Sequence, residues 1–260
     1  MVRMKKDERI LLNDLNELLN ITERFIKSNG QDGLTYFTLR PHVMWNNLIL
    51  MHHNALSVSI LLQDKQIYSS SALVRVLIEQ WVNMNYIYLT KSYKSLVRFL
   101  YHGDVEFIQT NKRYETFIKE NPDYRRAFKD EDFTEVGKYR EDAIRELKKY
   151  KYELKKMPDL RTRADLVDTK NGNRNLTALY MGRYLINSIS IHSSKDTLFA
   201  MTHAKNYSEL LTGYDLIADN FSQEAFMASH LIANALLFVE GKSKLSLPRE
   251  SRELISVYGT

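Results

Sequence analysis

SALVRVLIEQWVNMNYIYLTK, residues 71–91, is apolar on nearly every side when it is wound as a helix. A helix of this kind belongs in the centre of a bundle, because each of its faces needs an apolar neighbour. The serines at 69–71 can cap its first turn, since serine hydroxyls accept hydrogen bonds from the free backbone amides there. The stretch therefore predicts an all-helical fold built around this segment.

Further helices are expected on both sides of this stretch. Residues 5–28 carry apolar side chains at steps of three and four, which is typical of an amphipathic helix, and Gly30 and Gly33 are expected to end it. Pro41 is placed to begin a second helix, and others are expected at about 93–119, 176–192 and 222–241. With 9 glycines, 4 prolines and no hairpin signal in 260 residues, we predict an all-α, multi-helix bundle.

The segment 122–160 differs in composition from the rest of the chain. It is rich in charge and poor in large aliphatic residues, and its Glu-to-Lys pairs one turn apart favour a solvated helix. We expect a long charged helical arm or insertion here, between an N-terminal half of the bundle (1–121) and its C-terminal half (161–242). A tail (243–260) follows. The arm is the expected contact surface for a protein partner.

Composition narrows the class of protein. The chain has no cysteine, which excludes disulfides, thiolate metal sites and cysteine nucleophiles. No apolar run reaches the length of about 20 residues that a membrane span needs, and the N-terminus lacks the apolar stretch of a signal peptide. We therefore expect a cytoplasmic protein without membrane contact. A net charge of +5 permits binding to RNA or another anion without requiring it.

Three polar residues interrupt the central apolar helix. Arg75, Glu79 and Asn83 follow one another at four-residue steps, so that they share one side of the helix. A charge in an apolar setting must be paired, and this spacing allows Arg75 and Glu79 to pair. Two interpretations stay open: a structural ion pair that fixes helix register, or a polar seam that lines an internal site.

A second candidate group lies in YLINSISIHSS, residues 184–194. On a helix Ser188 and His192 stand one turn apart, and Leu185 shares their side. We expect His192 to point partly into the bundle, with Glu79 as its candidate partner. A carboxylate would raise the pKa of this histidine and burial would lower it. His192 is either a hydrogen-bonded core residue or a working group of a site.

Other motifs give little support for a metal or cofactor. His52 and His53 point about 100° apart on a helix and cannot both face one site. The sequence has no Glu-x-x-His pair of a di-iron bundle, no phosphate-binding glycine loop and no Gly-x-Ser-x-Gly. His102, Asp104 and Glu106 form only a loose cluster. We expect no cofactor and no metal.

Residues 55–89, ALSVSILLQDKQIYSSSALVRVLIEQWVNMNYIYL, resemble the front half of a bacterial all-helical family of uncharacterised function. The shared pattern is an apolar helix, a short polar turn and a helix with Arg-x-x-x-Glu, matched here by Arg75 and Glu79. That family also carries a later Tyr-x-x-x-Ser-x-x-x-His element, matched by Tyr184, Ser188 and His192. The two elements together span roughly half of the chain.

This family is in turn similar to the HEPN domains (higher eukaryotes and prokaryotes nucleotide-binding), helical bundles of bacterial toxins and antiphage systems, many of them metal-independent endoribonucleases. The resemblance implies a homo-oligomer that acts on RNA. An arginine would stabilise the phosphate and His192 would activate the ribose 2′-hydroxyl. The chain departs from the HEPN motif of Arg, a polar residue, four to six residues and His. Arg183 is too far ahead of His192. RFLYH, ending at His102, is too short, because only two residues separate Phe99 at the polar position from the histidine.

Two functions are therefore expected to compete. The first is a HEPN-like bacterial stress or antiphage-defence protein, a metal-independent endoribonuclease or toxin effector, with Arg75, Glu79, Ser188 and His192 forming the site. The second is a non-catalytic helical interaction or accessory subunit that binds a protein partner. The first requires these residues to converge on a cleft that solvent can reach. The second requires them to be buried, with an exposed apolar patch elsewhere.

Overall fold

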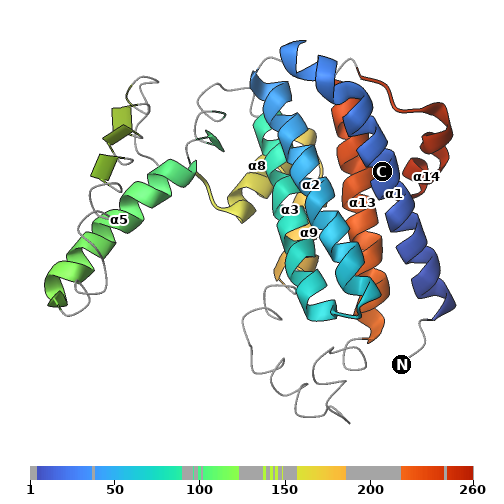
Figure 1. The fold of residues 1–260 in the computed structure, drawn as a ribbon, viewed down its shortest axis with the longest axis horizontal. Helices are drawn as coiled ribbons and strands as arrows, with labels where there is room; N and C mark the ends of the chain where they lie inside the picture. Colours follow the sequence, from blue (N-terminus) through green and yellow to red (C-terminus); the bar gives the residue numbers. More distant parts are fainter. Residues whose placement is uncertain are drawn as a thin grey trace, which may run out of the picture. The chain divides into compact units, whose positions relative to one another are not determined.

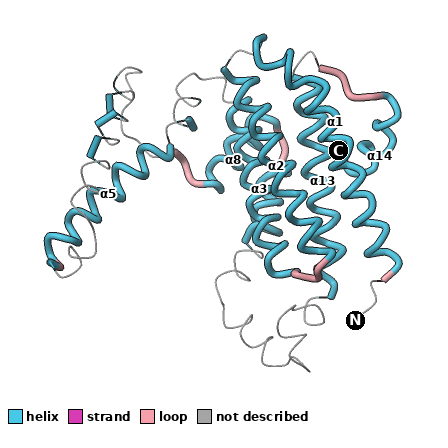
Figure 2. Tube along the Cα trace, in the orientation of Figure 1, coloured by secondary structure: helices cyan, strands magenta, loops and turns pink. Residues whose placement is uncertain are grey.

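The structure is a computed structural model. It describes residues 5–36, 39–89, 102–122, 157–185, 218–242 and 245–259, with isolated positions between 96 and 148. All regular elements in these ranges are helical (Figure 2). The predicted all-α class is thereby confirmed. Within the same ranges, no helix has the length and apolar character needed to cross a membrane.

The chain divides into two compact units. One consists of Met1–Tyr88 together with Leu160–Thr260, and the other of Leu89–Asp159. The second unit is thus an insertion in the sequence of the first. It contains α5 (His102–Glu120) as well as the charged segment. Ile108 and Ile118 form the buried side of α5, and Asn121 and Pro122 directly follow its last residue.

Four long helices of the first unit lie side by side as a bundle (Figure 1). They are α1 (Lys6–Tyr36), α2 (Leu39–Gln63), α3 (Ile67–Leu89) and α13 (Ala218–Lys242). Their shared core includes the fully buried Leu15, Phe25, Trp45, Leu48, Leu77, Ile78, Phe221 and Leu231. Each such side chain contributes about 1.5–3 kcal/mol by leaving water, so this core is the main source of stability.

Aromatic contacts connect α3 to α13 within the bundle. The ring of Phe238 lies 5.5 Å from that of Trp81 and 5.3 Å from that of Tyr88, both edge to face. Edge-to-face geometry is favoured because the positive edge of one ring meets the negative face of the other. These rings therefore help to hold α3 against α13.

The first helix is longer than the glycines suggest. The prediction that Gly30 and Gly33 end it is wrong, because α1 continues to Tyr36. A glycine inside a helix costs about 1 kcal/mol relative to alanine. A cost of this size does not by itself stop a helix, and α1 passes through both glycines.

The turn from α2 to α3 uses a left-handed residue. The Gln66 amide donates to the Leu61 carbonyl at 2.7 Å and the Lys65 amide to the Leu62 carbonyl at 3.0 Å. Lys65 has a φ of 60°. This pair of bonds is a Schellman motif, in which the left-handed position is usually a glycine.

The C-terminal segment packs on the bundle. It consists of η2 (Arg249–Ser251) and α14 (Arg252–Tyr258). Ile255 and Tyr258 are buried, and the Tyr258 hydroxyl donates to the Asp14 carboxylate at 2.6 Å. The tail therefore ties α14 to α1.

Candidate functional site

Four polar residues form one stripe along α3. They are Ser71, Arg75, Glu79 and Asn83, each four residues after the last. Residues at this spacing lie on the same side of a helix. We call these four residues the polar stripe. All four contact the second half of the chain, and their partners are Glu224, Tyr184 and Arg163.

Arg75 contacts Tyr184 of η1 (Tyr180–Tyr184). Its Nη2 donates a hydrogen bond to the Tyr184 hydroxyl at 2.9 Å, and its guanidinium carbon lies 4.6 Å from the centroid of the Tyr184 ring. The contact therefore combines a charge-assisted hydrogen bond with a cation–π interaction. It joins the two sequence elements that carry the family resemblance.

Glu79 and Asn83 both bind Arg163 of α8 (Leu160–Asn171). Arg163 is only 6% exposed. Its Nη2 lies 3.9 Å from Glu79 Oε1, and its Nη1 donates to Asn83 Oδ1. A buried guanidinium requires such partners because its desolvation is otherwise uncompensated. The Glu79 side chain is 44% exposed, so solvent reaches the stripe at this point.

Ser71 binds the carboxylate of Glu224, which comes from α13. The serine hydroxyl donates to Glu224 Oε1 at 2.8 Å, and both residues are buried. The polar stripe thus meets α13 at its first residue, η1 at its second and α8 at its last two. It is the surface on which the second half of the chain converges on α3.

The helix that carries Tyr184 is wound as a π-helix. The Leu185 amide donates to the Tyr180 carbonyl, five residues back. Tyr180 and Tyr184 stack with ring centroids 5.1 Å apart and planes inclined by 19°. Single π turns are rare and occur frequently at functional sites, which marks this turn as part of the candidate site.

A helical hairpin positions Arg163 and Tyr184. It joins α8 to α9 (Asn175–Leu179) through a turn in which Gly172 has a φ of +68°. Asp168 is buried and accepts the backbone amides of Leu176 at 3.1 Å and Thr177 at 2.7 Å. Its carboxylate satisfies two free amides at the start of α9, which fixes the direction of the chain towards η1.

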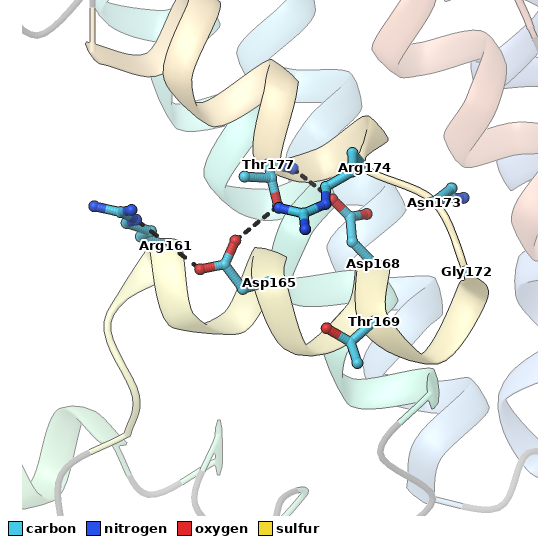
Figure 3. Close-up of a pocket in the computed structure, with 8 residues that line it drawn as sticks. All are labelled: Arg161, Asp165, Asp168, Thr169, Gly172, Asn173, Arg174 and Thr177. Atoms are coloured by element: carbon cyan, nitrogen blue, oxygen red, sulfur yellow. Dashed lines mark hydrogen bonds and ion pairs between the residues drawn. The ribbon is translucent and has the colours of Figure 1, made fainter.

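The outer side of this hairpin has a cavity of about 440 Å³ (Figure 3). Asp165 accepts the Thr177 hydroxyl at 2.8 Å and lies 3.9 Å from Arg161. Both cavity carboxylates, Asp165 and Asp168, therefore have structural partners. The full lining is Arg161, Asp165, Asp168, Thr169, Gly172, Asn173, Arg174 and Thr177. We assign this cavity to the architecture of the hairpin.

The structure brings together part of the predicted site. Arg75 and Glu79 share one side of α3, yet their partners are Tyr184 and Arg163, and no bond joins the two. Ser188 and His192 lie outside the described residues. The Glu79–His192 pairing and the convergence of all four residues therefore stay predictions. In the part of the chain that is described, no three His, Asp or Glu side chains could hold a metal ion.

Sequence reasoning did not single out Arg163 and Glu224. Glu224 lies near the start of a long apolar helix, so the argument applied to Arg75 could have found it. Arg163 had no comparable signal, because Arg161 stands two positions before it in a short charged segment. The two arginines differ in the face of α8 on which they lie, since Arg163 is buried and the Arg161 side chain is 63% exposed.

The fold and the polar stripe define an all-α bundle protein that has an inserted unit and a polar contact surface on α3. Residues 47–209 match DUF5677, a family of unknown function. This match covers more than half of the chain, and the chain belongs to that family. The matched residues include the whole polar stripe, Arg163 and Tyr184, while Glu224 lies beyond them. Neither a curated protein nor a solved structure matches the chain.

Proposed function

We propose that this chain is a HEPN-like bacterial protein of stress or antiphage defence, and that it cleaves RNA without a metal ion at the polar stripe. The observation that supports this proposal is the Arg75–Tyr184 contact. It unites the Arg-x-x-x-Glu element with the first residue of the Tyr-x-x-x-Ser-x-x-x-His element. These two residues are 109 positions apart in the sequence.

The charge of Arg75 supports an anionic ligand. Among the described residues its partner is a neutral tyrosine, whereas Glu79 pairs with Arg163. Arg75 is partly exposed, and a guanidinium has five N–H donors, most of which are left for a ligand. A phosphate diester fits this geometry because guanidinium groups bind phosphate oxygens with two parallel hydrogen bonds. The net charge of +5 acts in the same direction.

In the proposed reaction the ribose 2′-hydroxyl is the nucleophile. His192 removes its proton, the 2′-oxygen attacks phosphorus, and the bond from phosphorus to the 5′-oxygen breaks. The leaving 5′-oxygen takes a proton from water, and His192 returns its proton to the solvent. One product ends in a 2′,3′-cyclic phosphate and the other in a 5′-hydroxyl. Arg75 stabilises the negative charge on the phosphoryl oxygens. Glu79 and Ser188 hold the site as hydrogen-bonding groups.

Expression in a bacterial host tests this proposal. Wild type is compared with His192→Ala, Arg75→Ala and the control Arg24→Ala, which removes an exposed positive charge of α1 outside the matched residues. Total RNA is examined on a gel, and circular dichroism checks folding. We expect wild type and Arg24→Ala to arrest growth and fragment RNA, and the two site variants to do neither. Intact RNA in cells that express folded wild type would refute the nuclease.

The second candidate is a non-catalytic accessory subunit that binds a protein partner. Exposed aliphatic residues on α2 favour it: Leu50 is 53% exposed, Leu56 41% and Ile60 50%. They lie in residues 41–63, which contain no Asp, Glu, Lys or Arg. Exposed apolar patches mark interaction surfaces. Loss of a co-purifying partner in Leu56→Ser/Ile60→Ser, together with RNA left intact by wild type, would favour this function.

The homo-oligomeric state also remains a proposal. Light scattering on purified wild type measures it directly. A mass near twice the 30.6 kDa of the chain would agree with it, and a mass near 30.6 kDa would exclude it at the concentration used.

A further inference from the structure

We infer that Tyr180 is a stacking platform for a base of single-stranded RNA, next to the phosphate that Arg75 binds. This inference rests on the proposed function and adds recognition of the base to it. It assigns a ligand-binding role to a residue outside the Arg-x-x-x-Glu and Tyr-x-x-x-Ser-x-x-x-His elements.

A series of contacts leads from Arg75 through Tyr184 to Tyr180. Arg75 binds Tyr184 through its hydroxyl and its ring, and Tyr184 stacks on Tyr180 nearly in parallel. Tyr184 is thus held from α3, and it in turn supports the ring of Tyr180. The Arg75 guanidinium and the rings of Tyr184 and Tyr180 thus form a row, which we call the Arg75 row. It places a positive charge beside flat aromatic surfaces.

Tyr180 is partly exposed. Within the described part of the chain its ring stacks on no aromatic ring except Tyr184, and its hydroxyl has no hydrogen bond. The buried Tyr258 differs from it, because its hydroxyl donates to Asp14. The ring of Tyr180 is therefore held by Tyr184 and is not part of the buried core of the bundle.

The backbone that carries Tyr180 and Tyr184 is wound irregularly. π-helix is rare, well below one residue in a hundred, and here it spans Tyr180–Tyr184. Packing does not explain it at Gly182 in the middle of the turn, because a Cβ built there would meet nothing within 4 Å. Met181 of the same turn is 48% exposed. The irregular winding thus lies at a partly exposed turn that also holds the two stacked rings.

The chemistry of the row matches a single strand of RNA. Along such a strand phosphates and bases alternate, and unpaired bases stack on aromatic side chains while arginines bind the backbone. Base pairs in a duplex hide these faces in their own stack. We therefore expect a preference for single-stranded RNA, with base dependence contributed by Tyr180 and backbone dependence by Arg75.

Fluorescence anisotropy with two probes tests the inference. One probe is a single-stranded RNA 12-mer, and the other has the same backbone without bases. The variants are Tyr180→Leu, which removes the aromatic face, Tyr180→Phe, which keeps it, and Met181→Ala as a control on the same turn. To prevent cleavage all are made in a His192→Ala background, and each melting temperature is measured.

Tyr180→Leu should bind the 12-mer about five- to a hundredfold more weakly than its parent. Tyr180→Phe and Met181→Ala should stay within about twofold, and binding of the baseless probe should be unchanged in all three. Arg75→Ala should weaken binding of both probes. This pattern separates a base contact from a phosphate contact and from misfolding.

Two outcomes would overturn the inference in distinguishable ways. Equal binding by Tyr180→Leu and its parent, or equal binding of both probes by the parent, removes the platform and leaves the RNA function standing. Failure of the folded parent protein to bind either probe removes the proposed function, and the platform with it. An acidic protein segment would then be the remaining ligand for the Arg75 row.

Discussion

Arg163 binds Glu79 and Asn83, the last two residues of the polar stripe. Its guanidinium is buried while Glu79 is partly in water, so the two members of the pair are not equivalent. Removal of Glu79 leaves a buried charge with one partner fewer, whereas removal of Arg163 leaves a carboxylate that solvent can hydrate. The loss of a partner lowers the free energy of unfolding mainly when the charged residue that remains is buried.

A double-mutant cycle tests this asymmetry. Glu79→Ala should lower the free energy of unfolding by about 1–2 kcal/mol more in wild type than in an Arg163→Met background. Urea denaturation of the four proteins gives the coupling energy. Additive effects of the two substitutions would show that the contact contributes nothing.

His52 makes stability depend on pH near neutrality. Burial, and to a lesser extent the adjacent His53, lower the pKa of His52 below its usual 6.5. As the pH falls through 6.5, the unfolded state therefore takes up a proton before the folded state does. The free energy of unfolding should decrease between about pH 7 and pH 5 for this reason.

His52→Gln should flatten this decrease, because the proton uptake by the unfolded state is then removed. Urea unfolding at four pH values between 5 and 8 measures it, with the exposed His53→Gln as the matched control. The control should keep most of the decrease, since burial is the larger cause of the shift. An unchanged pH profile in His52→Gln would contradict the assignment.

At the scale of elements, the α2–α3 turn places a lysine where the backbone favours glycine. Lys65 adopts a left-handed conformation, which costs a residue with a Cβ about 1–2 kcal/mol. Lys65→Gly should raise the free energy of unfolding by up to about 1 kcal/mol, because glycine avoids that cost but loses more entropy on folding. Thermal denaturation measures the change.

Asp64→Gly is the control for this prediction. Asp64 is the neighbouring residue of the same turn and has no positive φ. Glycine there brings the entropic cost without the conformational gain, so it should be destabilising by about 0.5–1 kcal/mol. A stabilising Asp64→Gly, or a destabilising Lys65→Gly, would mean that backbone conformation does not control this turn.

Elements also show how far the sequence could predict this protein. α3 was predictable as a largely buried helix because apolar residues occur on all its faces, and Arg75 and Glu79 were conspicuous on it for the same reason. The end of α1 was not, since a glycine costs a helix only about 1 kcal/mol and is therefore a weak stop signal. The π turn at Tyr180–Tyr184 and the burial of Arg163 depend on tertiary packing. No hydrophobic period or motif spacing in the local sequence predicts either feature.

At the scale of the whole molecule, α14 connects the last residues of the chain to α1. The Tyr258 hydroxyl donates to the Asp14 carboxylate, and its backbone carbonyl lies 2.7 Å from His230 Nδ1 on α13. The Leu247 amide adds a bond to Glu240. The tail thus contacts the first and last helices of the bundle together.

Tyr258→Phe should lower the free energy of unfolding by about 1–3 kcal/mol at neutral pH, since it removes a hydrogen bond to a charged group. Burial and Asp14 raise the pKa of this phenol, so the unfolded state alone loses its proton above pH 10. The stability that the Tyr258–Asp14 hydrogen bond gives to wild type should therefore decrease as the pH rises above 10. Tyr258→Phe lacks this bond and should not show this decrease. Chemical denaturation at pH 7 and pH 10.5 compares the two. Equal stability of both proteins at pH 7 would contradict the role of the bond.

The Asn83–Arg163 contact has a consequence for how this family can diversify. The two residues are 80 positions apart, and the inserted unit, Leu89–Asp159, lies between them in the sequence. The contact thus closes a chain loop at its base. For a flexible loop, each doubling of length costs only about 0.6 kcal/mol in closure entropy. The bundle should therefore tolerate a shorter or longer chain between these two residues at little cost, provided that the residues at the base are kept.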